Sequence, residues 1–343
     1  MADQRLDLLR QWLQQELGYS DYGIAPASAD ASFRRYFRVT LPDGSTRVVM
    51  DAPPDKEDVG PFVRIAAMLS DVGVHAPRVL ARQAASGFLL LTDLGTRLYL
   101  PELCRAGRAD SLYADALAAL LRIQSHGARH ARQLPPYDEK LLRFEMSLFP
   151  DWLLARHLEL ALDSTESRAL QAAMDALVVN AQEQPQVFVH RDYHSRNLMV
   201  CEQGNPGILD FQDAVCGPLT YDLVSLLRDS YIAWPQERVA GWALRFRSAA
   251  LAAGLPAGRD DAQFLRWFDL VGVQRHLKIG GIFARLWLRD GKLGYLADIP
   301  RTLQYAVNSC ARHPDFAALG ELLERRVLPA VVARLARDGS QAP

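Results

Sequence analysis

The stretch HRDYHSRN at residues 190–197, followed by ILDFQ at residues 208–212, is the most informative part of this chain. Asp192 lies five residues before Asn197, and Asp210 follows thirteen residues after Asn197. Apolar, strand-like runs flank these polar residues at 187–189, 198–200 and 207–209. The sequence QGNPG at 203–207 predicts a turn. A hairpin there would bring Asn197 and Asp210 to the same end of two short strands.

An Asp, an Asn and a second Asp at this spacing are typical of phosphoryl transfer from ATP. In that chemistry Asp192 would accept the proton of the attacking hydroxyl, while Asn197 and Asp210 would bind Mg²⁺. Magnesium prefers a few carboxylate or amide oxygens together with phosphate and water. Either short motif alone could be a chance match in a surface loop. Their combination favours a site that uses ATP and Mg²⁺.

Composition narrows the class of protein. The chain has 343 residues, 49% of them hydrophobic, which is enough for a bilobal enzyme with a full core. Its net charge of -1 predicts no general attraction to nucleic acid or to anionic membranes. Four widely spaced cysteines argue against a disulfide framework or a structural zinc site. Without an apolar leader or a long uncharged apolar run, we expect a soluble, cytoplasmic protein.

Periodicity predicts a change of structure along the chain. After an opening helix at about 3–17, we expect strands near Ile24 and at 36–40, 46–50, 77–80 and 87–91, with one helix at 60–71. Helical spacing then dominates at 111–125, 138–160, 165–183, 221–230, 237–253, 262–289, 301–310 and 317–338. This pattern predicts an α+β protein with a small β-rich N-lobe, residues 1–94, and a larger, mostly helical C-lobe, residues 95–343. The hinge would lie near 92–95.

Two segments of the N-lobe are candidates for nucleotide binding. The loop at 29–35 is placed to cover phosphates, with Ser32 as a donor and Arg34 or Arg35 as charge partners. It has no glycine signature, so a solvated basic turn is an equally good interpretation. The hinge backbone at Thr92, Asp93 and Leu94 is expected to bind adenine. We expect the side chains of this hinge to matter little.

These motifs together resemble those of the aminoglycoside phosphotransferase and choline kinase superfamily, whose members share the bilobal protein-kinase-like fold. The likeness extends over about residues 29–230. The superfamily's HGDxHxxN loop corresponds to residues 190–197, its metal-binding strand to 208–212, and its GxxxxDL element to GPLTYDL at 217–223. Residues 49–54, 91–95 and 148–152 resemble a narrower group within this superfamily. Its members are bacterial kinases that phosphorylate the anomeric hydroxyl of N-acetylmuramate and N-acetylglucosamine during peptidoglycan recycling.

Two features depart from the kinase pattern. The strand that should end in a phosphate-binding Lys or Arg ends at Asp51, and Arg64 stands where a Glu partner is expected. Gln212 replaces the usual glycine of the metal loop. Asp222, at the start of an apolar helix, is interpreted as a helix cap or a buried support for the catalytic loop rather than as a catalytic residue.

The resemblance implies that late helices wall the acceptor site, and their charge bears on the substrate. Between residues 264 and 301, the sequence contains seven Lys and Arg residues but only three Asp residues. This excess favours a neutral or anionic amino sugar over a polycationic aminoglycoside. Arg275 and Lys278 are our candidates for the lactyl carboxylate of N-acetylmuramate, and Glu145 and Asp213 for sugar hydroxyls.

Three alternatives stay open at this point. The chain could phosphorylate an aminoglycoside or another small alcohol, or it could bind nucleotide without catalysis because the usual Lys is missing. The four-residue spacing of His190 and His194 also suggests a zinc hydrolase. That spacing lacks the HExxH glutamate, so both histidines are expected to brace the loop instead.

Overall fold

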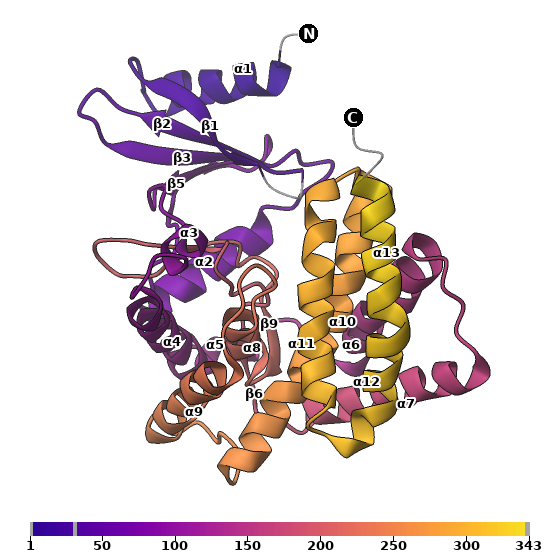
Figure 1. Cartoon of the computed structure of the whole chain (residues 1–343). Coiled ribbons are helices and arrows are strands. Elements are labelled where there is room, and N and C mark those ends of the chain that lie inside the picture. Colours follow the sequence, from indigo (N-terminus) through magenta and orange to yellow (C-terminus); the bar gives the residue numbers. More distant parts are fainter. Residues whose placement is uncertain (1–2, 30–32, 340–343) are drawn as a thin grey trace. The chain divides into compact units, whose positions relative to one another are not determined.

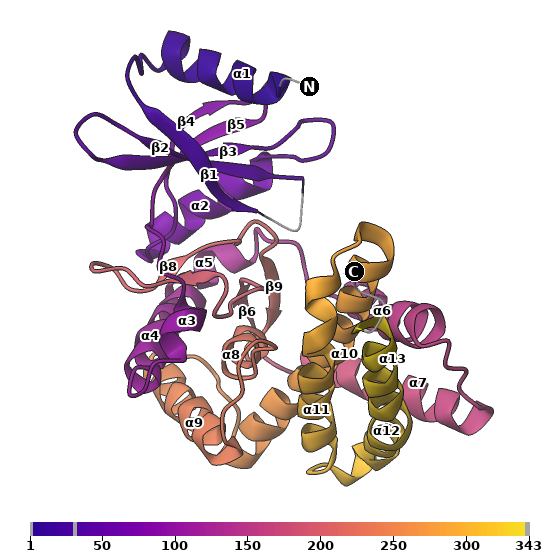
Figure 2. The same ribbon diagram turned by 45° about the horizontal axis from the view of Figure 1, so that its top comes forward.

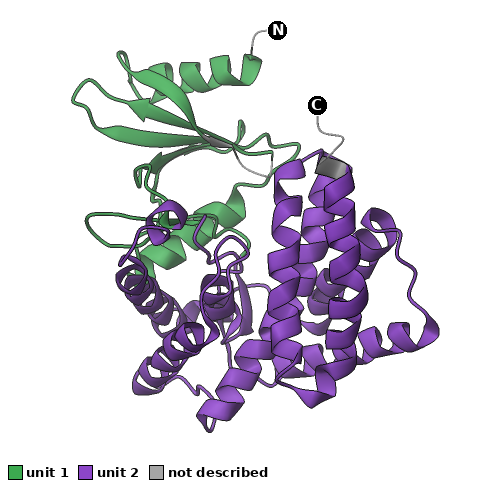
Figure 3. Cartoon of the chain, viewed as in Figure 1, with its two compact units in different colours: residues 1–99, 197–213 green, residues 100–196, 214–343 purple. Residues whose placement is uncertain are grey.

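The computed structural model of the protein describes residues 3–29 and 33–339. It divides into two compact units, shown in separate colours in Figure 3. Unit 1 comprises residues 1–99 and 197–213, and unit 2 comprises residues 100–196 and 214–343. Within the described ranges, no helix is both long enough and apolar enough to cross a membrane.

Unit 1 is built on a five-stranded antiparallel sheet in the order β1-β2-β3-β5-β4. Helices α1 and α2 lie against opposite faces of this sheet (Figures 1 and 2). The five strands and one inserted helix that the sequence predicted are therefore confirmed. The bounds are α1 (Gln4–Gln11), β1 (Gly23–Ala29), β2 (Arg35–Thr40), β3 (Thr46–Asp51), α2 (Gly60–Val72), β4 (Val79–Gln83) and β5 (Phe88–Thr92).

The opening helix is held to the sheet by apolar packing. It continues beyond Gln11 as a wider π-helical turn over Trp12–Glu16. Strand side chains alternate between the two faces, so every second residue of β2, β3 and β5 faces this helix. Burying large apolar side chains stabilises such a contact by about 1.5–3 kcal/mol each. The buried cluster consists of Leu9, Trp12, Leu13, Phe37, Val39, Val49, Phe88 and Leu90.

A hairpin from later in the chain completes unit 1. Strands β7 (Leu198–Met199) and β8 (Gly207–Ile208) pair antiparallel, as predicted from the turn sequence. Met199 bridges to Leu98, and Gly207 bridges to His75. These backbone contacts explain why residues 197–213 group with unit 1, whereas sequence periodicity placed them in the C-lobe. They also place the end of the first segment at residue 99 rather than 94.

Unit 2 is mostly helical and is organised around one long helix, α10 (Asp261–Asp290). Helices α10 and α11 contact each other extensively, and α11 also packs against α13 (Figures 1 and 2). A short β6–β9 pair leads into the loop at 190–197, the candidate catalytic loop. The other bounds are α3 (Tyr99–Leu103), α4 (Ala109–His126), α5 (Ala128–Ala131), α6 (Glu139–Leu148), α7 (Ser164–Gln182), β6 (Gln186–Val189), β9 (Val215–Pro218), α8 (Tyr221–Leu227), α9 (Gln236–Ala252), α11 (Ile299–Cys310), α12 (Ala317–Leu322) and α13 (Leu328–Gly339).

The predicted helices of the second lobe are confirmed, with two local differences. The helix expected at 138–160 changes to π-helical turns at Phe149–His157, where Pro150 enters the first turn. The helix expected at 317–338 is interrupted by a π-helical turn at Leu323–Val327. The strand-like run at 187–189 is confirmed as β6, but its partner β9 and the short helices α3 and α5 were not predicted, because each is too short to give a periodic signal.

Candidate active site

The loop that follows β6 is fixed by a buried carboxylate. Asp222, in the first turn of α8, accepts hydrogen bonds from the backbone N–H groups of His190 (2.6 Å) and Arg191 (2.9 Å). Burial raises the pKa of Asp222 to about 7, although these two donors act in the opposite direction. Asp222 thus supports the loop, as predicted. His190 also braces it, because its Nδ1 accepts from the Asp192 N–H at 3.3 Å.

Arg191 occupies a backbone conformation that normally favours glycine. Its φ is 78°, in the left-handed region, and it stands at the glycine position of the HGDxHxxN pattern. A side chain there costs about 1 kcal/mol or more relative to glycine. The guanidinium forms an ion pair with Glu145, a residue of α6 that is 2% exposed. The strained residue therefore ties the catalytic loop to the helical core of unit 2.

Glu145 is the centre of a buried charge cluster. Besides Arg191, it binds Lys278 Nζ of α10 at 2.8 Å and accepts from the Tyr137 hydroxyl. Lys278 also donates to the Tyr221 hydroxyl at 3.0 Å. Burial alone would raise the pKa of Glu145, but the charges of Lys278 and Arg191 lower it. Glu145 thus has partners within its own chain, and Lys278 already has a carboxylate, which weighs against the predicted contacts of both residues with the sugar.

Asp192 lies in a region of positive charge. Burial would raise its pKa, but Lys278, His194, Arg275 and Arg191 lower it. The carboxylate is therefore ionised near neutral pH and can accept a proton.

Arg275, one helical turn before Lys278, is 3% exposed. Its Nη1 has no hydrogen-bond partner within the part of the chain that the structure describes. Its charge acts on Asp192, His194 and Asp222. Arg275 thus lies beside the candidate base with donor capacity left over.

The metal candidates meet at the base of the β7–β8 hairpin. Asn197 Nδ2 lies 3.2 Å from Asp210 Oδ2, and the Leu209 N–H donates to the Asn197 carbonyl at 2.9 Å. Asp210 has a φ of 60°, so the chain bends sharply there. Gln212 Nε2 donates to Asp210 Oδ1 at 2.8 Å. Asp213, a candidate for sugar hydroxyls, is exposed in unit 1, whereas Glu145 belongs to unit 2.

These donors fit magnesium. One carboxylate and one amide oxygen are hard ligands that leave most coordination positions to phosphate and water. Arg34 Nη2 lies 3.5 Å from Asp210 Oδ1, which shows that this carboxylate already attracts a cation. Within residues 3–29 and 33–339, no group of three His, Cys, Asp or Glu side chains could hold a metal ion. The zinc hypothesis therefore finds no third ligand there.

The structure gives different partners to the adjacent Arg34 and Arg35, the second of which begins β2. Arg34 approaches Asp210, whereas Arg35 binds Asp51 through Nε at 2.9 Å and also pairs with Asp3. Asp51 is fully buried at the end of β3 and also binds Arg5 of α1 through Nε at 2.8 Å. Arg35 is thus committed to carboxylates of its own unit, which argues against its predicted contact with phosphate. Ser32 lies outside the described residues.

Several backbone groups of the predicted adenine-binding segment already form hydrogen bonds within the protein. The Thr92 N–H donates to the Arg78 carbonyl at 3.0 Å, and the Leu94 carbonyl accepts from Cys201 Sγ at 3.6 Å. Asp93 binds Arg38 through Nε at 2.5 Å and accepts from the Gly95 N–H at 2.9 Å. The Asp93 carboxylate thus fixes the course of the chain as it leaves β5, while its predicted minor role in adenine binding stays a prediction.

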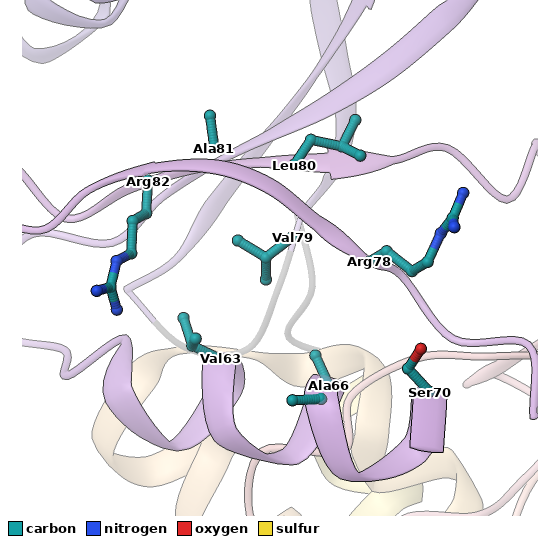
Figure 4. A pocket seen from close by; sticks show the side chains of 9 residues that line it. Val63, Ala66, Ser70, Arg78, Val79, Leu80, Ala81 and Arg82 are labelled. Carbon is teal, nitrogen blue, oxygen red and sulfur yellow. The ribbon is translucent and has the colours of Figure 1, made fainter. Parts of the chain in front are cut away.

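A separate hollow of about 490 Å³ lies between α2 and β4 in unit 1 (Figure 4). None of its lining residues is an acid, a histidine or a cysteine, so it offers no proton acceptor. It contains none of the candidate catalytic, metal-binding or sugar-binding residues. The lining residues are Val63, Ala66, Ala67, Ser70, Arg78, Val79, Leu80, Ala81 and Arg82.

Sequence reasoning missed one residue that shapes the catalytic loop. Asp229, 1% exposed, accepts from the Ser195 N–H at 3.0 Å, from the Ser195 hydroxyl and from the Tyr231 N–H at 3.0 Å. It lies far from Ser195 in the sequence, so no local spacing reveals the contact. An Asp two residues beyond a helix whose residues are mostly apolar is the signal that could have drawn attention to it.

Comparison with known proteins agrees with this geometry. The model of the phosphotransferase enzyme family matches residues 23–265, which is well over half of the chain. The chain belongs to this family. A curated relative from Pseudomonas aeruginosa, named N-acetylmuramate/N-acetylglucosamine kinase, is 51% identical over 300 residues, covering 88% of this chain and 87% of the relative. A Pseudomonas putida protein of the same name is 46% identical, covering 94% and 96%.

A solved structure extends the likeness to the fold. Plasmodium vivax ethanolamine kinase superposes with a TM-score of 0.63 at 11% identity, covering 93% of this chain and 92% of that one. At this identity the similarity concerns the fold alone. The protein-kinase-like α+β fold, and the assignment of this chain to the ATP-dependent phosphotransferases that act on alcohols, are confirmed.

Proposed function

We propose that this protein transfers the γ-phosphoryl group of ATP to the anomeric hydroxyl of N-acetylmuramate and of N-acetylglucosamine. The observation that carries the chemistry is Asp192, an ionised carboxylate on a loop fixed by Asp222 and Arg191. The names and high identity of the curated relatives support the choice of sugars. Because ATP is the donor, we place the reaction in the cytoplasm, as a step in peptidoglycan recycling.

Each residue would have a distinct part in this reaction. Asp192 would orient the anomeric hydroxyl and accept its proton, which is easier to remove than those of the other sugar hydroxyls. Asn197 and Asp210 would hold Mg²⁺, which neutralises phosphate charge when bound. Lys278 is already bound to Glu145, so we assign it to keeping Asp192 ionised. Arg275, with an unpartnered Nη1, would donate to an anionic or polar group beside Asp192.

The charge of unit 2 speaks against the aminoglycoside alternative. Arg275, Lys278 and Arg191 all act on Asp192, and a polycationic acceptor would be repelled there. We therefore favour a neutral or anionic sugar. The test is transfer of labelled phosphate to N-acetylmuramate, N-acetylglucosamine, kanamycin and the 1-O-methyl glycosides of both amino sugars. We expect only the two free sugars to be labelled. Labelling of a methyl glycoside would exclude anomeric transfer.

The role of Asp192 is tested by Asp192→Asn, which keeps the shape and removes the proton acceptor. We expect kcat to fall by about 100-fold or more, the usual scale for loss of a general base. Binding of the sugar, measured by calorimetry, should change little. Turnover like that of the wild type would show that Asp192 is not the base.

Arg34 is our candidate for the phosphate contact that the missing β3 Lys would otherwise supply. Its approach to Asp210 brings it close to the candidate metal ligands within unit 1. Arg34→Gln should raise KM for ATP by about 10-fold, since one charge-assisted hydrogen bond is lost. The matched control is Arg35→Gln, which should leave KM for ATP unchanged because Arg35 is bound by Asp51 and Asp3. The reverse pattern would transfer the role to Arg35.

A further inference from the structure

Arg196 is an exposed cation held by two aromatic rings. It is the last residue of the catalytic loop before Asn197. Its guanidinium carbon lies 4.6 Å from the ring centre of Tyr231 and 5.6 Å from that of Tyr295. Stacking on aromatic faces orients a guanidinium without neutralising its charge. None of the ion pairs among the described residues includes Arg196, and its neighbour Asp298 is paired with Arg301 at 3.0 Å.

Arg238, a second arginine of unit 2, also stacks on two aromatic rings but has a purely structural role. Arg238 lies over the rings of Trp234 (4.6 Å) and Trp242 (4.7 Å), in the same kind of aromatic contact. It also forms an ion pair with Asp110 at 3.0 Å. Arg238 thus has a carboxylate from its own chain. Arg196 has the aromatic contact and the exposure, but its carboxylate must come from elsewhere.

Arg196 is tied to the surroundings of Asp192. The carboxylate of Asp229 binds both Ser195, the residue before Arg196, and the backbone of Tyr231, the ring on which Arg196 stacks. The His194 ring packs edge-on against Tyr231 at 5.6 Å. The charges of Asp192 and Arg196 both act on His194. One buried carboxylate therefore sets the position of the aromatic contact relative to the loop that carries the candidate base.

The two proposed sugars differ in one charged group that an exposed cation could bind. N-acetylmuramate carries a lactyl ether with a carboxylate, whereas N-acetylglucosamine is neutral. Lys278 and Arg191 are bound by Glu145, and Arg275 is buried, so Arg196 is the exposed cation of the catalytic loop. We infer that Arg196, held by Tyr231 and Tyr295, binds the carboxylate of acidic amino-sugar substrates and sets the preference between acidic and neutral sugars. This inference rests on the proposed function.

The test compares wild type, Arg196→Gln and Arg196→Lys on three substrates: N-acetylmuramate, its uncharged methyl ester and N-acetylglucosamine. Arg196→Gln should raise KM for N-acetylmuramate by about 10-fold or more, the effect of one lost charge-assisted hydrogen bond. Its kcat, and the KM values for the ester and for N-acetylglucosamine, should stay within about 2-fold. Arg196→Lys keeps the charge but loses the planar fork, so it should lie between the two.

Arg238→Gln is the matched control, because it disturbs an aromatic contact of the same kind but should not change the ratio of KM values for the two sugars. Midpoints of thermal unfolding show whether each variant folds. Equal losses on all three substrates, or no loss on any, would overturn the inference and leave the kinase activity standing. Wild-type protein that phosphorylates neither sugar would overturn the proposed function, and this inference with it.

Discussion

Unit 1 and unit 2 each contain a buried carboxylate that binds two cations, Asp51 in unit 1 and Glu145 in unit 2, and the two clusters have different roles. Asp51 binds Arg5 and Arg35, whose side chains are 29% and 38% exposed, so these guanidiniums reach water. Glu145 binds Arg191 and Lys278, whose side chains are only 19% and 7% exposed. The chemistry is similar, but the location of the cations differs.

In unit 1 the cations come from α1 and β2, so the Asp51 cluster joins the opening helix to the sheet. In unit 2 they come from the catalytic loop and from α10, so the Glu145 cluster joins the candidate base to the core. A buried ion cluster thus acquires its function from the elements that it connects. We expect Asp51 to affect stability alone and Glu145 to affect stability and turnover together.

The largest effect is expected for Glu145→Gln. It leaves Lys278 and Arg191 buried without a full negative charge, which typically costs about 3–5 kcal/mol. We expect a lower free energy of unfolding in urea, and a lower kcat at temperatures where the variant is folded. The control is Glu139→Gln on the same helix, which breaks only an exposed pair with Arg143. If kcat of folded Glu145→Gln matched wild type, the cluster would be purely structural.

A smaller effect is expected for Asp51→Asn. Its two arginines can turn to water, so we expect a loss of about 1–3 kcal/mol, the scale for hydrogen bonds to a charged group. Measured well below the unfolding midpoint, kcat and KM for ATP should equal those of the wild type. A fall in kcat without a fall in stability would contradict the distinction drawn between the two clusters.

The smallest effect is a dependence of stability on pH. The charges of Lys278 and Arg191 outweigh burial and lower the pKa of Glu145 below its usual 4.5. A lowered pKa in the folded state contributes stability above the unfolded value, and this contribution is lost as pH falls through the folded pKa. The difference in unfolding free energy between wild type and Glu145→Gln should therefore be constant near neutral pH and shrink below about pH 4.5. A difference that grows on acidification would reverse the sign.

Features that depend on residues close together in the sequence could be predicted, whereas contacts between residues far apart in the sequence could not. The longer helices, most strands and the turn at 203–207 leave local patterns in the sequence, and these elements were predicted; the short α3, α5 and β9 leave none and were not. The role of Asp222 followed from a motif. The partners of Glu145 could not be predicted, because Lys278 lies on a helix more than a hundred residues away and the ion pair leaves no periodic signal. For the same reason Lys278 and Glu145 were assigned to the sugar rather than to each other.

The same limit explains the misplaced hairpin. Its bridges to Leu98 and His75 are backbone contacts, which carry no side-chain signature. Arg196 was overlooked because its loop position is variable in the HGDxHxxN pattern, and only the structure shows the rings of Tyr231 and Tyr295 beside it.

The late hairpin has a consequence for the order in which the protein can fold during synthesis. The bridges from Leu98 to Met199 and from His75 to Gly207 cannot form until the later residue of each pair has been synthesised. Unit 1 therefore lacks part of its structure until roughly a hundred further residues have been added. At about 5–20 residues per second, that delay is on the order of ten seconds. The chain must therefore make much of unit 2 before unit 1 is complete. A fragment ending at residue 99 would lack the β7–β8 hairpin together with Asn197 and Asp210. We expect this fragment to be less stable than the intact unit 1.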